Sequence, residues 1–215
     1  GENEIILVFD RGMVSDENLK HLELNKYIYI TAMDKNQIPN LNNVNIERFE
    51  ILNSENMIEQ ITKMMFVKYD DQTYYQNLGI VDGRRYVLIF NPVMFGDENN
   101  SRENLINRTK AYLDEESKDL SNAEKSRSKS TTRNRIDKQL KTMKADKFIE
   151  YDLESLVINK KGKEVSSFRI IPKETDATKE AIKQAKRTDG LWVIVTNNTG
   201  KEKEGKKLTE EDLIF

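Results

Sequence analysis

Residues 5–33, IILVFDRGMVSDENLKHLELNKYIYITAM, decide the fold class of this chain. The apolar run from Ile5 to Phe9 is rich in branched residues, which predicts a strand buried on both faces. Ser15 then offers a cap for a helix that we expect to end near Leu24. A second apolar run, Tyr27 to Met33, predicts a second strand. Strand, helix and strand within about 30 residues form a βαβ unit, whose two strands should be parallel.

Asp10 directly follows the first of these strands, and Gly12 permits a turn just after it. Open α/β sheets place their chemistry at the carboxyl ends of strands. A carboxylate at that position can hold a divalent metal, accept a phosphoryl group or orient a base. An aspartate that only caps a turn has the same local pattern, so the residues alone leave both interpretations open.

Composition narrows the chemistry that the chain can perform. The chain has 215 residues, a net charge of -2, no cysteine and one histidine, His21. These counts exclude a disulfide framework, a cysteine nucleophile, and thiolate or multi-histidine metal sites. Carboxylate and carbonyl oxygens remain as metal ligands, and they suit magnesium or manganese. No apolar run approaches a membrane span and no signal peptide is visible, so we expect a cytoplasmic protein without a membrane partner.

The rest of the chain predicts a mixture of short strands and polar helices. Asp82-Gly83 is a strong signal for a hairpin turn between two strands, and Pro92 should end that sheet. The expected helices cover residues 55–65, 101–119, 133–144 and 177–186, and one more begins at residue 208. The expected strands cover residues 66–71, 73–81, 84–91, 148–158, 165–171 and 191–196.

Several segments together resemble one family of enzymes. VFDRGMVSDENL (8–19), followed by YIYITAM (27–33), resembles the second-aspartate segment of insertion-sequence DDE transposases. The likeness is to the branch with a C-terminal Tyr-x2-Arg-x3-Glu-x6-Lys signature. DGLWVIVTNNTG (189–200) and LTEEDLIF (208–215) resemble the stretch that leads into that signature. YVLIFNP (86–92) and the basic helical middle resemble the insertion between the second aspartate and the glutamate.

The resemblance implies a mixed α/β fold, a partial RNase H-like sheet with a large β-plus-helix insertion. Residues 1–33 would be core, residues 34–187 the insertion, and residues 188–215 a core strand with the start of the helix leading to the catalytic glutamate. By this resemblance, Asp10 corresponds to the second catalytic aspartate of the family, which is a ligand of Mg²⁺ or Mn²⁺. The first aspartate and the signature residues have no counterpart in the chain. We therefore expect an excised fragment without useful nuclease or strand-transfer activity.

Such transposases cut a DNA phosphodiester with water and then join the freed 3′ hydroxyl to target DNA. Two metal ions about 3.5–4 Å apart activate the nucleophile and stabilise the leaving oxygen. A single carboxylate holds magnesium weakly, because this ion keeps its waters unless several ligands converge. The implied partners are transposon-end and target DNA, and a homo-oligomer is possible for the complete enzyme.

A strongly basic stretch lies in the expected insertion. Residues 125–147 hold nine Lys and Arg residues against two aspartates. Such a stretch can bind DNA phosphates, although charge runs often form only a solvated helix surface. The candidate DNA-binding residues are Arg127, Lys129, Arg133, Arg135, Lys138 and Lys141.

Two alternatives belong to other classes of protein. One is a non-enzymatic DNA-binding or assembly module in which Asp10 has no chemical role. The other is a phospho-acceptor domain of the receiver type, with Asp10 as acceptor. Receiver domains repeat the βα unit five times, and this sequence shows one clear unit. The coding sequence upstream and downstream of the chain distinguishes the transposase from these alternatives. A transposase needs one further catalytic carboxylate on each side of the chain.

Overall fold

The computed structural model of the chain describes residues 5–10, 15–33, 52, 55–200 and 207–214. The chain divides into two compact units. Unit 1 comprises Gly1–Asp97 and Arg187–Phe215, and unit 2 comprises Glu98–Lys186. The two units have separate hydrophobic cores.

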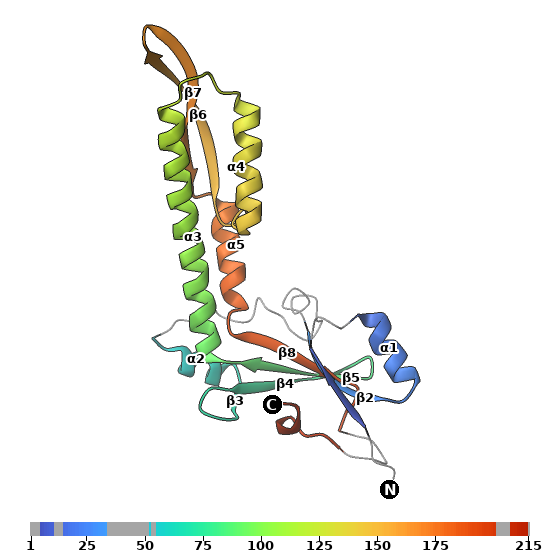
Figure 1. Ribbon diagram of the computed structural model, residues 1–215. Helices are drawn as coiled ribbons and strands as arrows, with labels where there is room; N and C mark the ends of the chain where they lie inside the picture. The colour runs from blue at the N-terminus through green and yellow to red at the C-terminus, as the bar shows by residue number, and fades with distance from the viewer. Residues whose placement is uncertain (1–4, 11–14, 34–51, 53–54, 201–206, 215) are drawn as a thin grey trace. The chain divides into compact units, whose positions relative to one another are not determined.

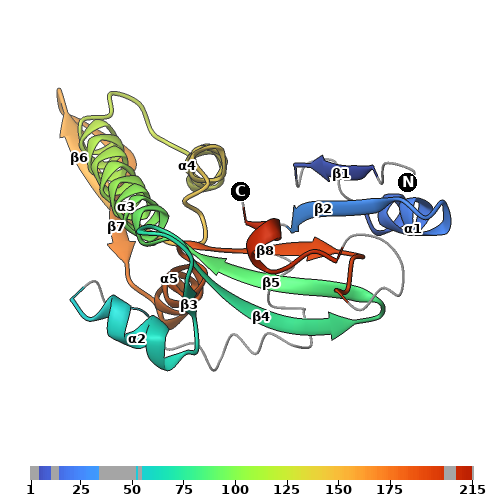
Figure 2. The same cartoon turned by 90° about the horizontal axis from the view of Figure 1, so that it is seen from below.

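Unit 1 is built on a six-stranded mixed sheet (Figures 1 and 2). Its strands are β1 (Ile6–Phe9), β2 (Ile28–Met33), β3 (Val67–Lys68), β4 (Tyr74–Val81), β5 (Arg84–Phe90) and β8 (Leu191–Thr196). Their order is β1-β2-β8-β5-β4-β3. β1 and β2 are parallel, and the other neighbouring pairs are antiparallel. The expected mixed α/β fold class is confirmed.

The βαβ unit predicted from residues 5–33 is present. Helix α1 (Asp16–Leu24) connects the two parallel strands, and the side chain of Ser15 caps it by accepting a 3.1 Å hydrogen bond from the Asn18 amide. The predicted burial of the first strand on both faces is wrong. β1 is an edge strand of the sheet, and Val8 within it is 54% exposed. The turn predicted at Gly12 lies outside the described residues.

Different segments of the chain pack on the two faces of the sheet. On one, here called the helix face, Tyr29, Leu88 and Val193 pack with residues of α1 and of α2 (Met57–Lys63). On the other, here called the C-terminal face, Ile30, Val87, Ile89 and Ile194 pack with Leu208, Leu213 and Ile214. Each fully buried side chain of this size stabilises the fold by about 1.5–3 kcal/mol. The segment Leu208–Ile214 is therefore an integral part of unit 1.

Arg84 of β5 binds two carboxylates of the α1 helix. Its Nε donates a 2.6 Å hydrogen bond to Glu23, and its Nη1 donates a 2.7 Å bond to Asp16. The Tyr29 hydroxyl donates to the same Glu23 oxygen at 2.7 Å. The Arg84 bond, aided by the Tyr29 bond, holds the pKa of Glu23 below its usual value. Burial and the bond to Glu23 raise the pKa of Tyr29.

Two places in unit 1 where residues have positive φ are the turn at Asp82-Gly83 and Gly190, directly before β8. Asp82 and Gly83 both have positive φ, 50° and 79°, which gives the predicted hairpin turn between β4 and β5. Gly190 has φ 66°, and its carbonyl accepts a 2.9 Å hydrogen bond from the Asn91 amide. A Cβ atom at Gly190 would lie 2.7 Å from the Asn91 carbonyl oxygen and 2.8 Å from Phe95 Cβ. Glycine is therefore required there by both conformation and space.

Unit 2 consists of helices and a long two-stranded hairpin. Its elements are α4 (Lys129–Met143), β6 (Glu150–Lys160), β7 (Lys163–Lys173), α5 (Asp176–Arg187) and most of α3 (Pro92–Ser121). α3 begins nine residues before the predicted start at Ser101. Proline suits the first position of a helix, and the Asn91 side chain caps α3 by accepting bonds from the Val93 and Met94 amides at 2.8 and 3.0 Å.

The core of unit 2 lies between the hairpin and its helices. Leu113, Ile136 and Leu140 from the helices pack with Leu153 and Phe168 from the strands. Hydrogen bonds fasten the end of α3 to β7, among them a 2.6 Å bond from the Ser167 hydroxyl to the Leu120 carbonyl oxygen. Ser128 caps α4 by accepting a bond from the Thr131 amide.

The division into units differs from the expected domain boundary at residue 34. The hairpin of β4 and β5, expected in the insertion, pairs through β5 with β8 in the main sheet. The boundary instead falls at Asp97, inside α3, and the chain returns to unit 1 at Arg187. Among the described residues, no helix is long and apolar enough to cross a membrane.

Candidate functional site

Asp10 lies directly beyond β1, and its side chain is exposed. The end of β1 is fixed to β2, because the buried Thr31 hydroxyl donates a 2.9 Å hydrogen bond to the Phe9 carbonyl oxygen. Phe9 itself packs on the helix face, with its ring 6.2 Å from that of Tyr29. The expected position of Asp10 at the carboxyl end of a strand in a βαβ unit is observed.

Strand alternation assigns Asp10 to one face of the sheet. Successive side chains of a strand point to opposite faces, so Asp10 follows Ile6 and Val8 rather than Leu7 and Phe9. Leu7 and Phe9 belong to the helix face, and Ile6 belongs to the C-terminal face. The alternation therefore predicts that Asp10 lies on the C-terminal face, which the segment Leu208–Ile214 partly covers.

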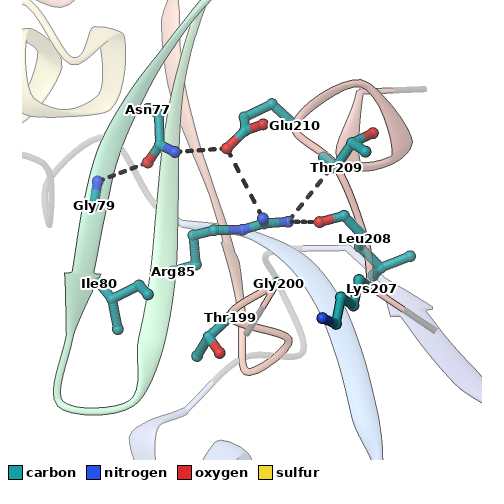
Figure 3. Close-up of a pocket in the computed structure, with 10 residues that line it drawn as sticks. All are labelled: Asn77, Gly79, Ile80, Arg85, Thr199, Gly200, Lys207, Leu208, Thr209 and Glu210. Atoms are coloured by element: carbon teal, nitrogen blue, oxygen red, sulfur yellow. Dashed lines mark hydrogen bonds and ion pairs between the residues drawn. The ribbon is translucent and has the colours of Figure 1, made fainter. Parts of the chain in front are cut away.

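Arg85 holds that segment on the sheet (Figure 3). The Arg85 side chain is buried, and its Nη2 donates a 2.7 Å hydrogen bond to the Leu208 carbonyl oxygen. Its Nη1 lies 3.9 Å from Glu210, which in turn accepts a 2.5 Å bond from the Asn77 amide group. Asn198 also fixes the segment, since its side-chain oxygen accepts a 3.1 Å bond from the Leu208 amide.

The same segment carries the hydrogen bonds of a helix start. The Thr209 hydroxyl accepts a 3.1 Å bond from the Asp212 amide, and the Asp212 carboxylate accepts a 2.8 Å bond from the Thr209 amide. This reciprocal pair is a capping box. Only a short 3₁₀ turn, Glu211–Leu213, follows within the described residues, where a longer helix is expected from the sequence.

A cavity of about 580 Å³ lies beside Arg85 (Figure 3). It is lined by residues of β4 and β5 and by the chain on either side of residues 201–206. In sheet register, Arg85 is aligned with Thr196, Ile30 and Val8 across four strands. At about 4.8 Å per strand, the backbones of β1 and β5 are separated by roughly 14 Å. Asp10 and the cavity are therefore distinct places on the sheet.

Among the described residues, no group of three or more acidic or histidine side chains could hold a metal ion. Magnesium needs several converging oxygen ligands, and Asp10 supplies one carboxylate.

The candidate DNA-binding residues separate into three environments. Arg127 and Lys129 lie on the loop before α4 and at its first position, and both are exposed. Lys138 and Lys141 lie on the exposed surface of α4, away from its buried side at Ile136. The structure thus leaves these four cations open to a ligand.

The other two candidates also have roles within unit 2. Arg135 donates a 2.6 Å hydrogen bond to Glu116 of α3, whose side chain is 14% exposed, and the pair raises the pKa of Arg135. The Arg133 guanidinium lies 5.3 Å from the centre of the Tyr151 ring. The Tyr151 hydroxyl donates a 2.7 Å bond to Asp137, and burial together with this bond raises the pKa of Tyr151.

The sequence interpretation misses Arg85 and its role. Two arginines, Arg84 and Arg85, begin an otherwise apolar strand that ends at Phe90, and this pair is the signal that could have found it, because a buried cation needs partners. Comparison of the chain with models of protein families, with curated proteins and with solved structures found no match in any of the three.

Proposed function

We propose that the chain is part of a DDE-type transposase, in which Asp10 is one of three catalytic carboxylates that bind metal for DNA cleavage and strand transfer. The observation that carries this proposal is the place of Asp10. It directly follows a strand of a parallel βαβ unit, and side-chain alternation along β1 predicts that it lies on the sheet face where Leu208–Ile214 packs. That segment starts with a capping box, which is the hydrogen-bond pattern of a helix start.

The position of β1 supports the same proposal. β1 is the edge strand of the described sheet, and Val8 on it is half exposed. A further strand can pair with this edge and bring a carboxylate next to Asp10. In the proposed enzyme, this is the place of the first aspartate.

The division into two units is also in keeping with a transposase core interrupted by an insertion. Unit 2 leaves unit 1 after β5 and returns just before β8. In the proposed enzyme, unit 2 contacts DNA through the exposed cations Arg127, Lys129, Lys138 and Lys141, while Arg133 and Arg135 also stabilise the unit itself. The protein would then act inside the cell, associated with DNA.

A non-enzymatic DNA-binding module is the second candidate. It is favoured by the basic surface of unit 2. A receiver-type phospho-acceptor domain has less support, because β8, β5, β4 and β3 are antiparallel to their neighbours.

The complete reading frame that encodes residues 1–215 separates the two candidates. A transposase requires an upstream strand with an aspartate, and a helix with Tyr-x2-Arg-x3-Glu-x6-Lys soon after Phe215. A reading frame that ends at Phe215 would contradict the proposal. The isolated chain should not cleave DNA with magnesium. Cleavage by the isolated chain that is lost in Asp10→Ala would show that the other carboxylates are not needed.

A further inference from the structure

The hairpin of β6 and β7 ends in a cluster of lysines for which the proposed function supplies no role. Lys160, Lys161 and Lys163 lie at its turn, and all three are exposed. Figure 1 shows this turn at the end of unit 2 where α3 ends and α4 begins. The three lysines are outside the basic stretch of residues 125–147, so the sequence alone does not connect the two groups.

Backbone hydrogen bonds bring the two groups to the same end of unit 2. The Arg127 amide donates a 2.9 Å bond to the Ser166 carbonyl oxygen, and the Ser166 amide donates a 3.1 Å bond to the Ser126 hydroxyl. Gly162 in the turn is four residues from Ser166, so the hairpin extends about 13 Å beyond this junction. We call the resulting surface the basic tip, and it consists of Lys125, Arg127, Lys160, Lys161 and Lys163.

The cations of the basic tip form no ion pairs within the described residues. None of its five cations lies within ion-pair distance of a described carboxylate. Glu124 and Glu164 are the acidic residues of the two segments, 122–128 and 158–165. Cations elsewhere in unit 2 do have partners, as Lys173 has Asp152.

We infer that the basic tip binds the phosphate backbone of double-stranded DNA. A duplex about 13 Å long carries about eight phosphate charges, enough to face all five cations. Lysine side chains are flexible point charges that suit phosphate contacts without reading base sequence. The two segments contain no aromatic residue, whereas proteins that bind single strands stack bases on aromatic rings. The choice of DNA among polyanions rests on the proposed function.

The test measures binding of a fluorescent 30-base-pair duplex to the chain of residues 1–215 at several salt concentrations. The variant carries Lys160→Gln, Lys161→Asn and Lys163→Gln. Asparagine is used at position 161 because Lys161 has φ 53°, which asparagine tolerates. We expect roughly a 10-fold or greater loss of affinity, and a plot of log affinity against log salt that is less steep by about 2–3, since three phosphate contacts are removed.

A matched control removes three lysines of unit 2 that lie away from the tip. Lys110→Gln, Lys179→Gln and Lys183→Gln change the net charge of the chain by the same amount. We expect this control to bind DNA within about twofold of the unchanged chain. Equal losses in the two variants would overturn the inference, because net charge alone would then explain them. Unchanged binding by the tip variant, absence of duplex binding by the chain, or tighter binding of a single strand would overturn it as well.

Unfolding curves of the two variants show whether each is folded. If the triple variant does not fold, Lys160→Gln alone is tested, at an exposed strand position. It should make the plot of log affinity against log salt less steep by about 1, because one phosphate contact is removed. Failure of this inference is distinguishable from failure of the transposase proposal. Duplex binding through the tip without DNA cleavage by the complete protein refutes the proposed enzyme alone, and cleavage without any role of the tip refutes this inference alone.

Discussion

The buried guanidinium of Arg85 donates a 2.7 Å hydrogen bond to the carbonyl oxygen of Leu208, and these residues are 123 positions apart in the chain. This bond holds the segment Leu208–Ile214 on the C-terminal face of the sheet, the face on which strand alternation predicts Asp10. In the proposed transposase, the segment leads to the helix with the catalytic glutamate. In that enzyme, the bond would position a part of the site without touching the reacting atoms.

Replacement of Arg85 by methionine tests this fastening. The change keeps a long side chain but leaves the Leu208 carbonyl without its donor, so unit 1 should lose about 1.5–3 kcal/mol of stability. Hydrogen exchange of the amides of residues 208–214 should become faster. Arg85→Lys keeps a charged donor and should have a smaller effect. Unchanged exchange in Arg85→Met would show that the segment is held by its apolar contacts alone.

Gly190→Ala should destabilise unit 1 strongly. The added Cβ would meet the Asn91 carbonyl oxygen at 2.7 Å, in addition to the strain of a positive φ. We expect a loss of about 3 kcal/mol or more, measured by urea unfolding with Trp192 as the reporter, since this is the one tryptophan of the chain.

Gly83→Ala is the control for that change. Gly83 has φ 79° but open space around its Cβ position, so alanine should cost only about 1–2 kcal/mol. Equal losses in the two variants would mean that the close approach at Gly190 relaxes freely.

The stability of unit 1 should depend on Glu23 in acid. The hydrogen bond from Arg84 lowers the pKa of Glu23 in the folded state. This contribution is present above the ordinary glutamate pKa of about 4.3 and is lost as the pH falls through the lower folded value. Glu23→Gln should reduce stability at neutral pH by about 1–3 kcal/mol and flatten the acid limb of the stability curve.

Urea unfolding followed by Trp192 between pH 3 and pH 7 measures both effects of Glu23→Gln. Glu17→Gln changes an exposed carboxylate on the same helix and should leave the curve near that of the unchanged chain. An acid limb as steep in Glu23→Gln as in the unchanged chain would show that other carboxylates set the pH dependence.

Arg135→Gln should act more on the stability of unit 2 than on DNA binding. It leaves the largely buried Glu116 without its cation, at an expected cost of about 1–3 kcal/mol. Helical circular dichroism during urea unfolding measures this loss. Lys138→Gln, on the exposed surface of the same helix, should cost less than about 0.5 kcal/mol. A larger fall in DNA affinity for Arg135→Gln than for the triple variant of the basic tip would contradict this assignment.

Local sequence patterns were sufficient to locate most strands but not to arrange them. The run Leu191–Thr196 is predicted with its observed bounds, because buried strands rich in branched residues are short apolar runs. The pairing of Arg85 with Thr196 joins residues more than 100 positions apart, and no local pattern encodes it. For the same reason, the expected domain boundary assigned β4 and β5 to the insertion rather than to the main sheet.

The candidate site was partly predictable for a similar physical reason. The position of Asp10 at the end of a strand could be predicted from the residues next to it. The sheet face on which Asp10 lies could not, because it depends on which distant segments pack on each face. The start of α3 at Pro92 depends on a cap from the Asn91 side chain, and proline alone indicated only the end of a strand. The basic tip depends on hydrogen bonds between segments 40 residues apart.

The most direct test of the central claim is transposition of a marker gene flanked by the DNA that borders the complete reading frame. The complete protein is supplied unchanged, with Asp10→Asn, or with Glu17→Gln as the matched carboxylate control, at equal abundance. We predict that Asp10→Asn lowers the frequency of transposition at least about 100-fold, while Glu17→Gln stays near the unchanged protein. A frequency for Asp10→Asn equal to that of the unchanged protein, or no transposition by the unchanged protein, would contradict the account.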